Sequence, residues 1–298
     1  MRILVAVDRS PYSALAVAEA AKLAQNTWAN VTLLGVDPER QKKGEKSASA
    51  PPAGDMGHHP LMEILRRYRE TFLGYFKGED SPYTGQGFDY EVIEMKKGVW
   101  EELRVCRAGK KDLRVRVRLG NPLREIITES VEKGSDLIVI ACDKENRCVW
   151  EKVGNVPQKV ASDAPCSVMV VKGKERINQV VCCLDHAQVS QASLELISQM
   201  VTLHHATLDI VGLTEKENLK AEVERKMDWI LKYYEARQIK PWIKLVDEYS
   251  LDAFISQKAR RGLVALWMGE KSVLGRIFPR SKVEKLVKTA ASSVLILR

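Results

Sequence analysis

Three stretches of the sequence carry residue types that could take part in ligand binding. An apolar run at residues 3–7 ends at Asp8, whose carboxylate could accept hydrogen bonds from a ribose or a base. A second apolar run ends at Val36, which could contact a flat ring. Residues 154–156 stand where a helix is expected to begin, and a helix start offers a phosphate free N–H groups and a positive dipole end. These features indicate binding chemistry.

Each of these features also has a purely structural explanation. Asp8 could instead cap the helix that Ser10 and Pro11 are expected to start. In the loop at residues 141–156, three basic side chains could assist a phosphate, but three acidic side chains cancel them. The sequence therefore permits a phosphate in this loop without requiring one.

The motifs that usually carry catalysis are missing from the sequence. It has no Gly-x-Ser-x-Gly elbow, no phosphate-binding loop ending in Gly-Lys-Ser or Gly-Lys-Thr, and no convincing set of metal ligands. His186 beside Asp185 could act as a base, but no nucleophile accompanies it. His58 and His59 adjoin a polar stretch and are expected in a solvated loop. We therefore predict a protein that binds rather than catalyses and that holds no metal.

Composition describes a folded protein without a membrane span. Of the 298 residues, 45% are hydrophobic and 29% charged, and no apolar run approaches the length of about 20 residues that crosses a bilayer. The start does not resemble a secretory signal, so we expect a cytoplasmic protein. The net charge of +8 is spread along the chain without interleaved aromatic residues, which makes nucleic acid an unlikely partner. The six cysteines form no C-x-x-C pair and are expected to be free thiols.

An internal repeat is the strongest signal in the sequence. Residues 3–8 (ILVAVD) resemble residues 180–185 (VVCCLD), and residues 31–36 (VTLLGV) resemble residues 208–213 (LDIVGL) at the same spacing. The chain is therefore predicted to hold two copies of one module, at residues 1–174 and 175–298. Each copy alternates apolar strands with helical patterns, which predicts a parallel sheet covered by helices. Asn121 followed by Pro122 predicts the start of one such helix, and Gly134 predicts its end.

The first copy is longer than the second, and its extra residues are expected at about 37–86. When the two copies are aligned, the helical pattern of residues 223–234 falls on residues 90–106. Residues 90–106 are therefore expected to form the regular helix of the first copy. Within the insertion, one face of an additional helix carries Leu61, Leu65, Tyr68 and Phe72. We expect this face to pack against its own domain, although docking on a membrane surface or a partner is an alternative.

Three segments together resemble the universal stress protein (UspA) family. They are residues 5–13 (VAVDRSPYS), residues 120–122 (GNP) with the strand at 136–139 (DLIV), and residues 164–171 (APCSVMVV). The resemblance covers nearly the whole chain except the insertion. It implies two Rossmann-like modules of the adenine nucleotide α-hydrolase type, each a five-stranded parallel sheet with helices on both faces. It also implies binding of ATP or AMP, at the carboxyl ends of the strands.

Members that bind ATP use a loop with the pattern Gly, two residues, Gly, nine residues, Gly-Ser. The first copy keeps the spacing but not all residues: Ala141 and Lys144 replace the first two glycines, Gly154 is retained, and Asn155 replaces the serine. The side chain of Lys144 would stand where the backbone may have to approach a phosphate closely. The resemblance therefore assigns the first copy one set of nucleotide-binding residues, which is Asp8, Val36, Ala141, Lys144, Gly154, Asn155 and Val156.

The second copy departs further from the family pattern. It keeps Asp185 and Gly269, but its loop is two residues shorter and ends in Arg280 and Ser281. Two hypotheses remain open. The protein is an adenine-nucleotide-binding stress-response module, or it is a nucleotide-free member that acts through dimerisation and protein–protein contacts. Family members pair through their last strands, so residues 166–171 and 294–297 could pair within one chain as a pseudo-dimer or between chains as a homodimer.

Overall fold

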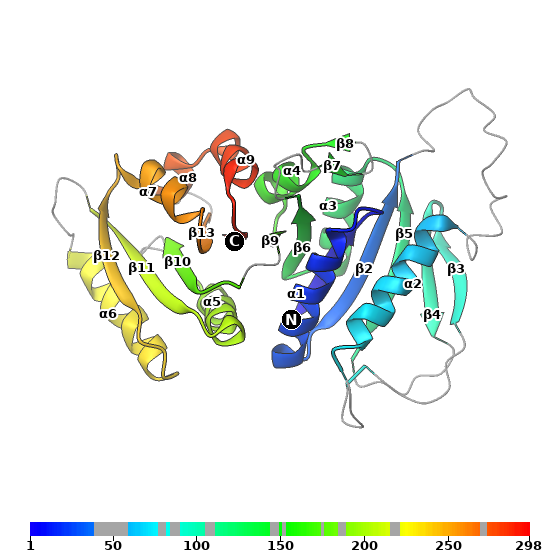
Figure 1. Ribbon diagram of the computed structural model, residues 1–298, viewed down its shortest axis with the longest axis horizontal. Helices are drawn as coiled ribbons and strands as arrows, with labels where there is room; N and C mark the ends of the chain where they lie inside the picture. Colours follow the sequence, from blue (N-terminus) through cyan, green and yellow to red (C-terminus); the bar gives the residue numbers. More distant parts are fainter. Residues whose placement is uncertain are drawn as a thin grey trace.

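A single twelve-stranded sheet runs through the whole molecule in the computed structural model. Figure 1 shows the two halves of the chain side by side, with the C-terminus at the junction between them. The structure describes residues 1–38, 59–76, 82–83, 90–104, 111–143, 149–150, 153–173, 176–183, 189–214, 221–268 and 273–298. Everything below concerns these residues.

Both halves contain the predicted five-stranded parallel sheet. In the first half the order is β5-β2-β1-β6-β9, and in the second it is β12-β11-β10-β13-β14, which is the same order of chain positions. The strands of the first half are β1 (Arg2–Val7), β2 (Asn30–Asp37), β5 (Leu113–Leu119), β6 (Leu137–Cys142) and β9 (Ser167–Lys172). Those of the second half are β10 (Gln179–Cys183), β11 (Thr207–Thr214), β12 (Trp242–Asp247), β13 (Leu263–Trp267) and β14 (Val294–Leu297).

The two five-stranded sheets join through their last strands. Strand β14 pairs antiparallel with β9, and Leu295 lies opposite Met169 in the register. Residues 3–7 and 137–142 are buried, as expected for strands that are covered on both faces. The terminal strands therefore pair within the chain, as the pseudo-dimer alternative predicted.

Helices cover both faces of the sheet. One face carries α1 (Ser13–Thr27), α2 (Pro60–Leu73), α5 (Gln191–His204) and α6 (Ala221–Glu235), whose buried side chains share one apolar cluster. The other face carries α3 (Pro122–Lys133), α4 (Val156–Asp163), α7 (Leu251–Lys258), α9 (Arg280–Thr289) and the short α8 (Val273–Ile277), around a second cluster. A two-stranded hairpin, β7 (Val149–Trp150) with β8 (Val153–Gly154), precedes α4.

The helix predicted at residues 90–106 is wrong. This segment contains an antiparallel hairpin of β3 (Tyr90–Lys96) and β4 (Val99–Arg104), and β4 extends the sheet by pairing with β5. Gly98, at φ +80°, lies in the turn between the two strands. The apolar residues that suggested a helix include Met95, which is 49% exposed. The buried positions of β4 include Glu101 and Glu102, whose charges conceal the alternation of a strand.

The regular crossover helix of the first half is α2, which the sequence had assigned to the insertion. Gly35 on β2 allows its approach, since a Cβ there would stand 2.9 Å from the side chain of Leu61 on α2. Gly212 on β11 has the same role, since a Cβ there would stand 3.0 Å from Met227 on α6. The predicted packing of Leu61 and the rest of this helix face against its own domain is confirmed. The added element of the first half is the β3–β4 hairpin.

The two helix starts that the sequence predicted differ in outcome. Helix α3 has the expected signals, because the Asn121 side chain accepts a hydrogen bond from the Arg124 N–H (3.2 Å) and Gly134 ends it at φ +57°. Helix α1 instead begins at Ser13, after a turn that includes Ser10 and Pro11. Among the described cysteines, Cys166, Cys182 and Cys183 are free thiols as expected, whereas Cys142 is disulfide-bonded, contrary to that expectation. Within the described residues, no helix is long and apolar enough to span a membrane.

Candidate functional site

Asp8 lies at the carboxyl end of β1, where the winding direction of the sheet changes between β1 and β6. The Asp8 carboxylate accepts hydrogen bonds from the Ser10 N–H (3.0 Å), the Ser10 hydroxyl (2.8 Å) and the Ser13 hydroxyl (2.6 Å). The residue is 1% exposed. Asp8 thus holds the turn that leads into α1. It is not the helix cap that the structural alternative expected, because the N-cap of α1 is Tyr12 and no side chain within the described residues caps that helix.

Helix α2 encloses the same turn. The Tyr68 hydroxyl donates a hydrogen bond to the backbone carbonyl of Ser10 at 3.1 Å. Burial, together with the negative charge of Asp8, raises the pKa of Tyr68 to about 12. Tyr68 is therefore a neutral phenol that donates across the turn at physiological pH. Sequence reasoning recognised Tyr68 only as part of an apolar helix face.

His59, predicted in a solvated loop, is buried at the carboxyl end of β2. Its Nε2 lies 2.9 Å from the Asp37 carboxylate, and its Nδ1 accepts a hydrogen bond from the Leu61 N–H at 3.2 Å. Because Nδ1 accepts, the ring proton must be on Nε2, where it is donated to Asp37. His59 is thus the N-cap of α2, followed by Pro60 in the first turn. In the sequence, an Asp at the end of a strand and a His directly before Pro were the signals that could have indicated this cap and its partner. His58 lies outside the described residues.

The start of α4 is the most open part of the predicted site. Gly154 and Asn155 are exposed, and among the described atoms none lies within 4 Å of a Cβ added at Gly154. Asn155 has a left-handed backbone (φ 66°), and within the described part of the chain its side chain makes no capping hydrogen bond. Since α4 connects β6 to the parallel strand β9, its N-terminal end lies at the carboxyl edge of the sheet.

The topology brings most of the predicted residues to one edge but divides them between its two faces. Strands β2, β1 and β6 are neighbours, so Asp8, Val36 and Ala141 end adjacent strands. Val36 and Val156 are buried in the cluster on the α3 and α4 face, whereas Ala141 belongs to the cluster on the α1 and α2 face. Lys144 lies outside the described residues.

The corresponding edge of the second half holds basic side chains at the start of α9. The Arg280 guanidinium lies 3.6 Å from the Asp163 carboxylate, and the Lys282 ammonium lies 3.3 Å from the Asp252 carboxylate. Part of the basic cluster is therefore engaged in ion pairs. Asp185 and Gly269 lie outside the described residues. Among the residues that the structure describes, no group of three or more His, Cys, Asp or Glu side chains could hold a metal ion.

This fold defines a protein of two α/β modules, each with a five-stranded parallel sheet of the same strand order. The profile of the universal stress protein family matches residues 1–172, so the chain belongs to that family. A comparison with curated proteins gave no match.

Solved structures share the fold along the whole chain. A universal stress protein from Archaeoglobus fulgidus has a TM-score of 0.59 at 13% identity, covering 100% of this chain and 98% of that chain. A functionally unknown protein from Pseudomonas aeruginosa has a TM-score of 0.55 at 15% identity, covering 99% and 92%. The cytoplasmic domain of a prokaryotic cation chloride cotransporter has a TM-score of 0.50 at 12% identity, covering 99% and 94%.

Proposed function

We propose that the protein is a tandem universal stress protein that binds an adenine nucleotide, ATP or AMP, at the carboxyl edge of its first half, and that it acts as a regulatory module without catalysis. The observation that carries this proposal is the exposed start of α4, where Gly154 leaves space and Asn155 leaves the helix uncapped within the described chain. Backbone N–H groups and the helix dipole at such a start favour a phosphate.

The ribose and base would occupy the edge beside β1 and β2. Asp8 would accept a hydrogen bond from a ribose hydroxyl in exchange for one of its two serine hydroxyl donors, which are 2.8 Å and 2.6 Å away. Such an exchange keeps the buried carboxylate hydrogen-bonded, so its cost is small compared with leaving the charge unpaired. Val36 would have to be uncovered for the base to reach it, because its side chain is fully buried.

A second candidate function has its own support. In a nucleotide-free stress protein that acts through dimerisation and protein contacts, Asp8 would serve only to hold its turn. Its hydrogen bonds to Ser10 and Ser13, and the burial of Val36 and Val156, favour this alternative.

Calorimetric titration with ATP, ADP and AMP separates the two candidates. Gly154→Asp places a negative charge at the start of α4, and we expect it to weaken nucleotide binding at least about tenfold through repulsion of the phosphates. Gly154→Asn adds a neutral side chain of the same shape and should bind more tightly than Gly154→Asp. Both variants should fold, because the position is open and its φ is not left-handed.

Absence of heat for the wild type at millimolar nucleotide would exclude the nucleotide-binding function and leave the second candidate. Equal weakening by Gly154→Asp and Gly154→Asn would show a steric effect rather than a phosphate at this helix. Analysis of the same samples for ADP tests the expected lack of turnover of ATP.

A further inference from the structure

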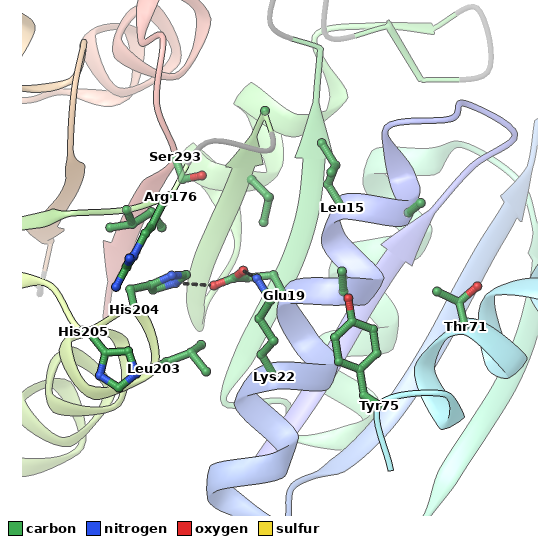
Figure 2. A pocket seen from close by; sticks show the side chains of 15 residues that line it. Leu15, Glu19, Lys22, Thr71, Tyr75, Arg176, Leu203, His204, His205 and Ser293 are labelled. Carbon is green, nitrogen blue, oxygen red and sulfur yellow. Dashed lines mark hydrogen bonds and ion pairs between the residues drawn. The ribbon is translucent and has the colours of Figure 1, made fainter. Parts of the chain in front are cut away.

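A cleft of about 610 Å³ lies between the two halves, on the face of the sheet that carries α1 and α5. One wall comes from α1 and the end of α2, and the other from the end of α5 and the segment that joins the halves. Figure 2 shows Glu19 and Lys22 on the side of α1 that faces Arg176, His204 and His205, with Tyr75 on the side of α1 toward α2. Of the residues predicted to bind a nucleotide, none that the structure describes lines this cleft.

Among the described residues that line the cleft, basic side chains outnumber acidic ones. Lys22 and Arg176 carry fixed positive charges, and His204 and His205 add two imidazoles. Among the described lining residues, Glu19 is the only carboxylate. A concave surface lined by one sign of charge concentrates the opposite sign of charge from solution. The cleft is therefore suited to an anion.

The Glu19 carboxylate is already engaged. Its Oε1 lies 2.6 Å from His204 Nε2, and its Oε2 lies 3.4 Å from Lys22 Nζ. Burial by itself would raise the pKa of Glu19, but the hydrogen bond and charge of His204, with Lys22, lower it. Glu19 and His204 are 6% and 9% exposed, so this pair forms a fixed polar floor that joins α1 to α5. Glu19 is therefore engaged by His204 and Lys22, both within the described residues.

Arg176 and His205 lie at the rim of the cleft. Both residues are exposed, and within the described part of the chain neither side chain makes a hydrogen bond or an ion pair. His205 is held in place by a left-handed backbone (φ 49°) as the C-cap of α5. In Figure 2 the Arg176 guanidinium extends toward the two histidines, which places planar donors on one side of the cleft. A guanidinium can bind a phosphate or carboxylate through two parallel hydrogen bonds.

The rest of the lining is largely apolar. Leu15 on α1 faces the cleft with Leu203 on α5 and Ile177 in the joining segment, and the Tyr75 ring lies at the end of α2. A volume of this size, with apolar walls and a few convergent polar groups, fits a small organic ligand rather than a bare ion.

We propose that this cleft between the halves binds a small amphipathic anion, whose phosphate or carboxylate head contacts Arg176 and His205 and whose apolar body packs against Leu15, Leu203 and Ile177. This is a second site, separate from the strand edge, and it does not depend on nucleotide binding. Because both halves supply its walls, an occupant would stabilise their contact.

The test is a calorimetric titration of the full chain with phenyl phosphate, benzoate, inorganic phosphate and phenol. We expect one or both aromatic anions to bind more tightly than phenol, which lacks the charge, and than inorganic phosphate, which lacks the apolar body. The two aromatic anions distinguish a phosphate site from a carboxylate site. Arg176→Glu should weaken binding of the tighter anion about tenfold, by replacing attraction with repulsion at a solvent-screened position. His205→Asn, which tolerates the left-handed backbone, should weaken it several-fold.

Arg261→Glu is the matched control, since Arg261 is exposed and lies outside the cleft, and it should bind as the wild type does. Thermal unfolding of each variant checks that the fold is retained. The proposal is overturned if neither aromatic anion binds at millimolar concentration, if phenol binds equally well, or if Arg176→Glu has no larger effect than Arg261→Glu. Loss of binding in Gly154→Asp would also overturn it, because the anion would then occupy the start of α4.

Discussion

Glu129 on α3 has a fully buried carboxylate that joins two arginines of β5. Its two oxygens accept hydrogen bonds from Arg116 and Arg118, each at 2.6 Å. Arg116 also binds Glu101 on β4 at 2.8 Å, and Arg118 binds Glu125 on α3 at 2.8 Å. Removing charges from water is costly, so the arrangement is stable only because each buried charge has a partner. The network ties the β3–β4 hairpin and α3 to the same strand.

We therefore expect Glu129→Gln to lower the free energy of unfolding by about 2–4 kcal/mol, because it leaves two buried guanidinium groups with one fewer negative charge. Urea unfolding at pH 7 measures the difference. Glu91→Gln, on the exposed face of β3, is the matched control and should change the value by less than about 0.5 kcal/mol. Equal effects of the two substitutions would mean that the buried network contributes no more than surface charge.

In each half, a glycine on the second strand lets the crossover helix pack closely. Gly35 on β2 has this role for α2, and Gly212 on β11 has it for α6. Substituting Gly35→Ala would place a methyl group 2.9 Å from the Leu61 side chain, which is inside normal contact distance. We expect a loss of stability of about 1–3 kcal/mol, since inserting an atom into a packed core forces neighbours to move. Thermal unfolding measures it. Gly154→Ala is the control, because the space around that position is open among the described atoms. If the two variants unfold together, α2 does not pack as closely as the structure indicates.

Elements whose apolar pattern matched their burial were predictable from the sequence. The strands at residues 3–7 and 137–142 and the caps of α3 at Asn121 and Gly134 follow from apolar runs and from start and stop signals. The β3–β4 hairpin was missed because its inward positions include Glu101, which is buried through an arginine partner on another strand. A charged side chain at an inward position interrupts the alternation of apolar and polar residues by which a half-buried strand is recognised.

The placement of Asp8 and Val36 at one edge of the sheet was predictable, but their burial was not. Asp8 was expected at a strand end beside Val36 because parallel strands place their carboxyl ends at one edge. Its enclosure by Tyr68 could not be anticipated, because the sequence had placed α2 in an insertion rather than over β2. The position of His59 was missed for the same reason. The cleft between the halves depends on how α1 meets α5, which no motif encodes.

Two equivalent contacts connect the halves of the molecule across the β9–β14 junction. In each, a basic side chain of one half donates to backbone carbonyls of the other half. Lys172, the last residue of β9, donates from Nζ to the Ala290 carbonyl at 2.6 Å, beyond the end of α9. Arg298, directly after β14, donates to the Ala161 and Ser162 carbonyls of α4 at 2.9 Å and 2.8 Å. Each half thus supplies a cation to the C-terminal end of a helix in the other half, where the helix dipole favours positive charge.

The Lys172 contact predicts a pH dependence of stability. Burial lowers the pKa of Lys172 from its usual 10.5 to about 8. Between these values the folded protein has released the proton while the unfolded chain still binds it, so the free energy of unfolding rises with pH over this interval. Lys172→Met removes the group, so the wild type should gain stability relative to this variant as the pH increases from 8 to 10.5. Comparing the two proteins cancels the titration of tyrosines and other lysines that both share.

Urea unfolding at several pH values across that interval measures the difference. Lys285→Met, on the exposed face of α9, serves as the control and should follow the wild-type profile. A parallel profile for wild type and Lys172→Met would mean that the Lys172 ammonium is as well solvated in the folded protein as in the unfolded chain. In that case the helix end at Ala290 would be open to water, and the junction between the halves would be looser than the paired strands β9 and β14 imply.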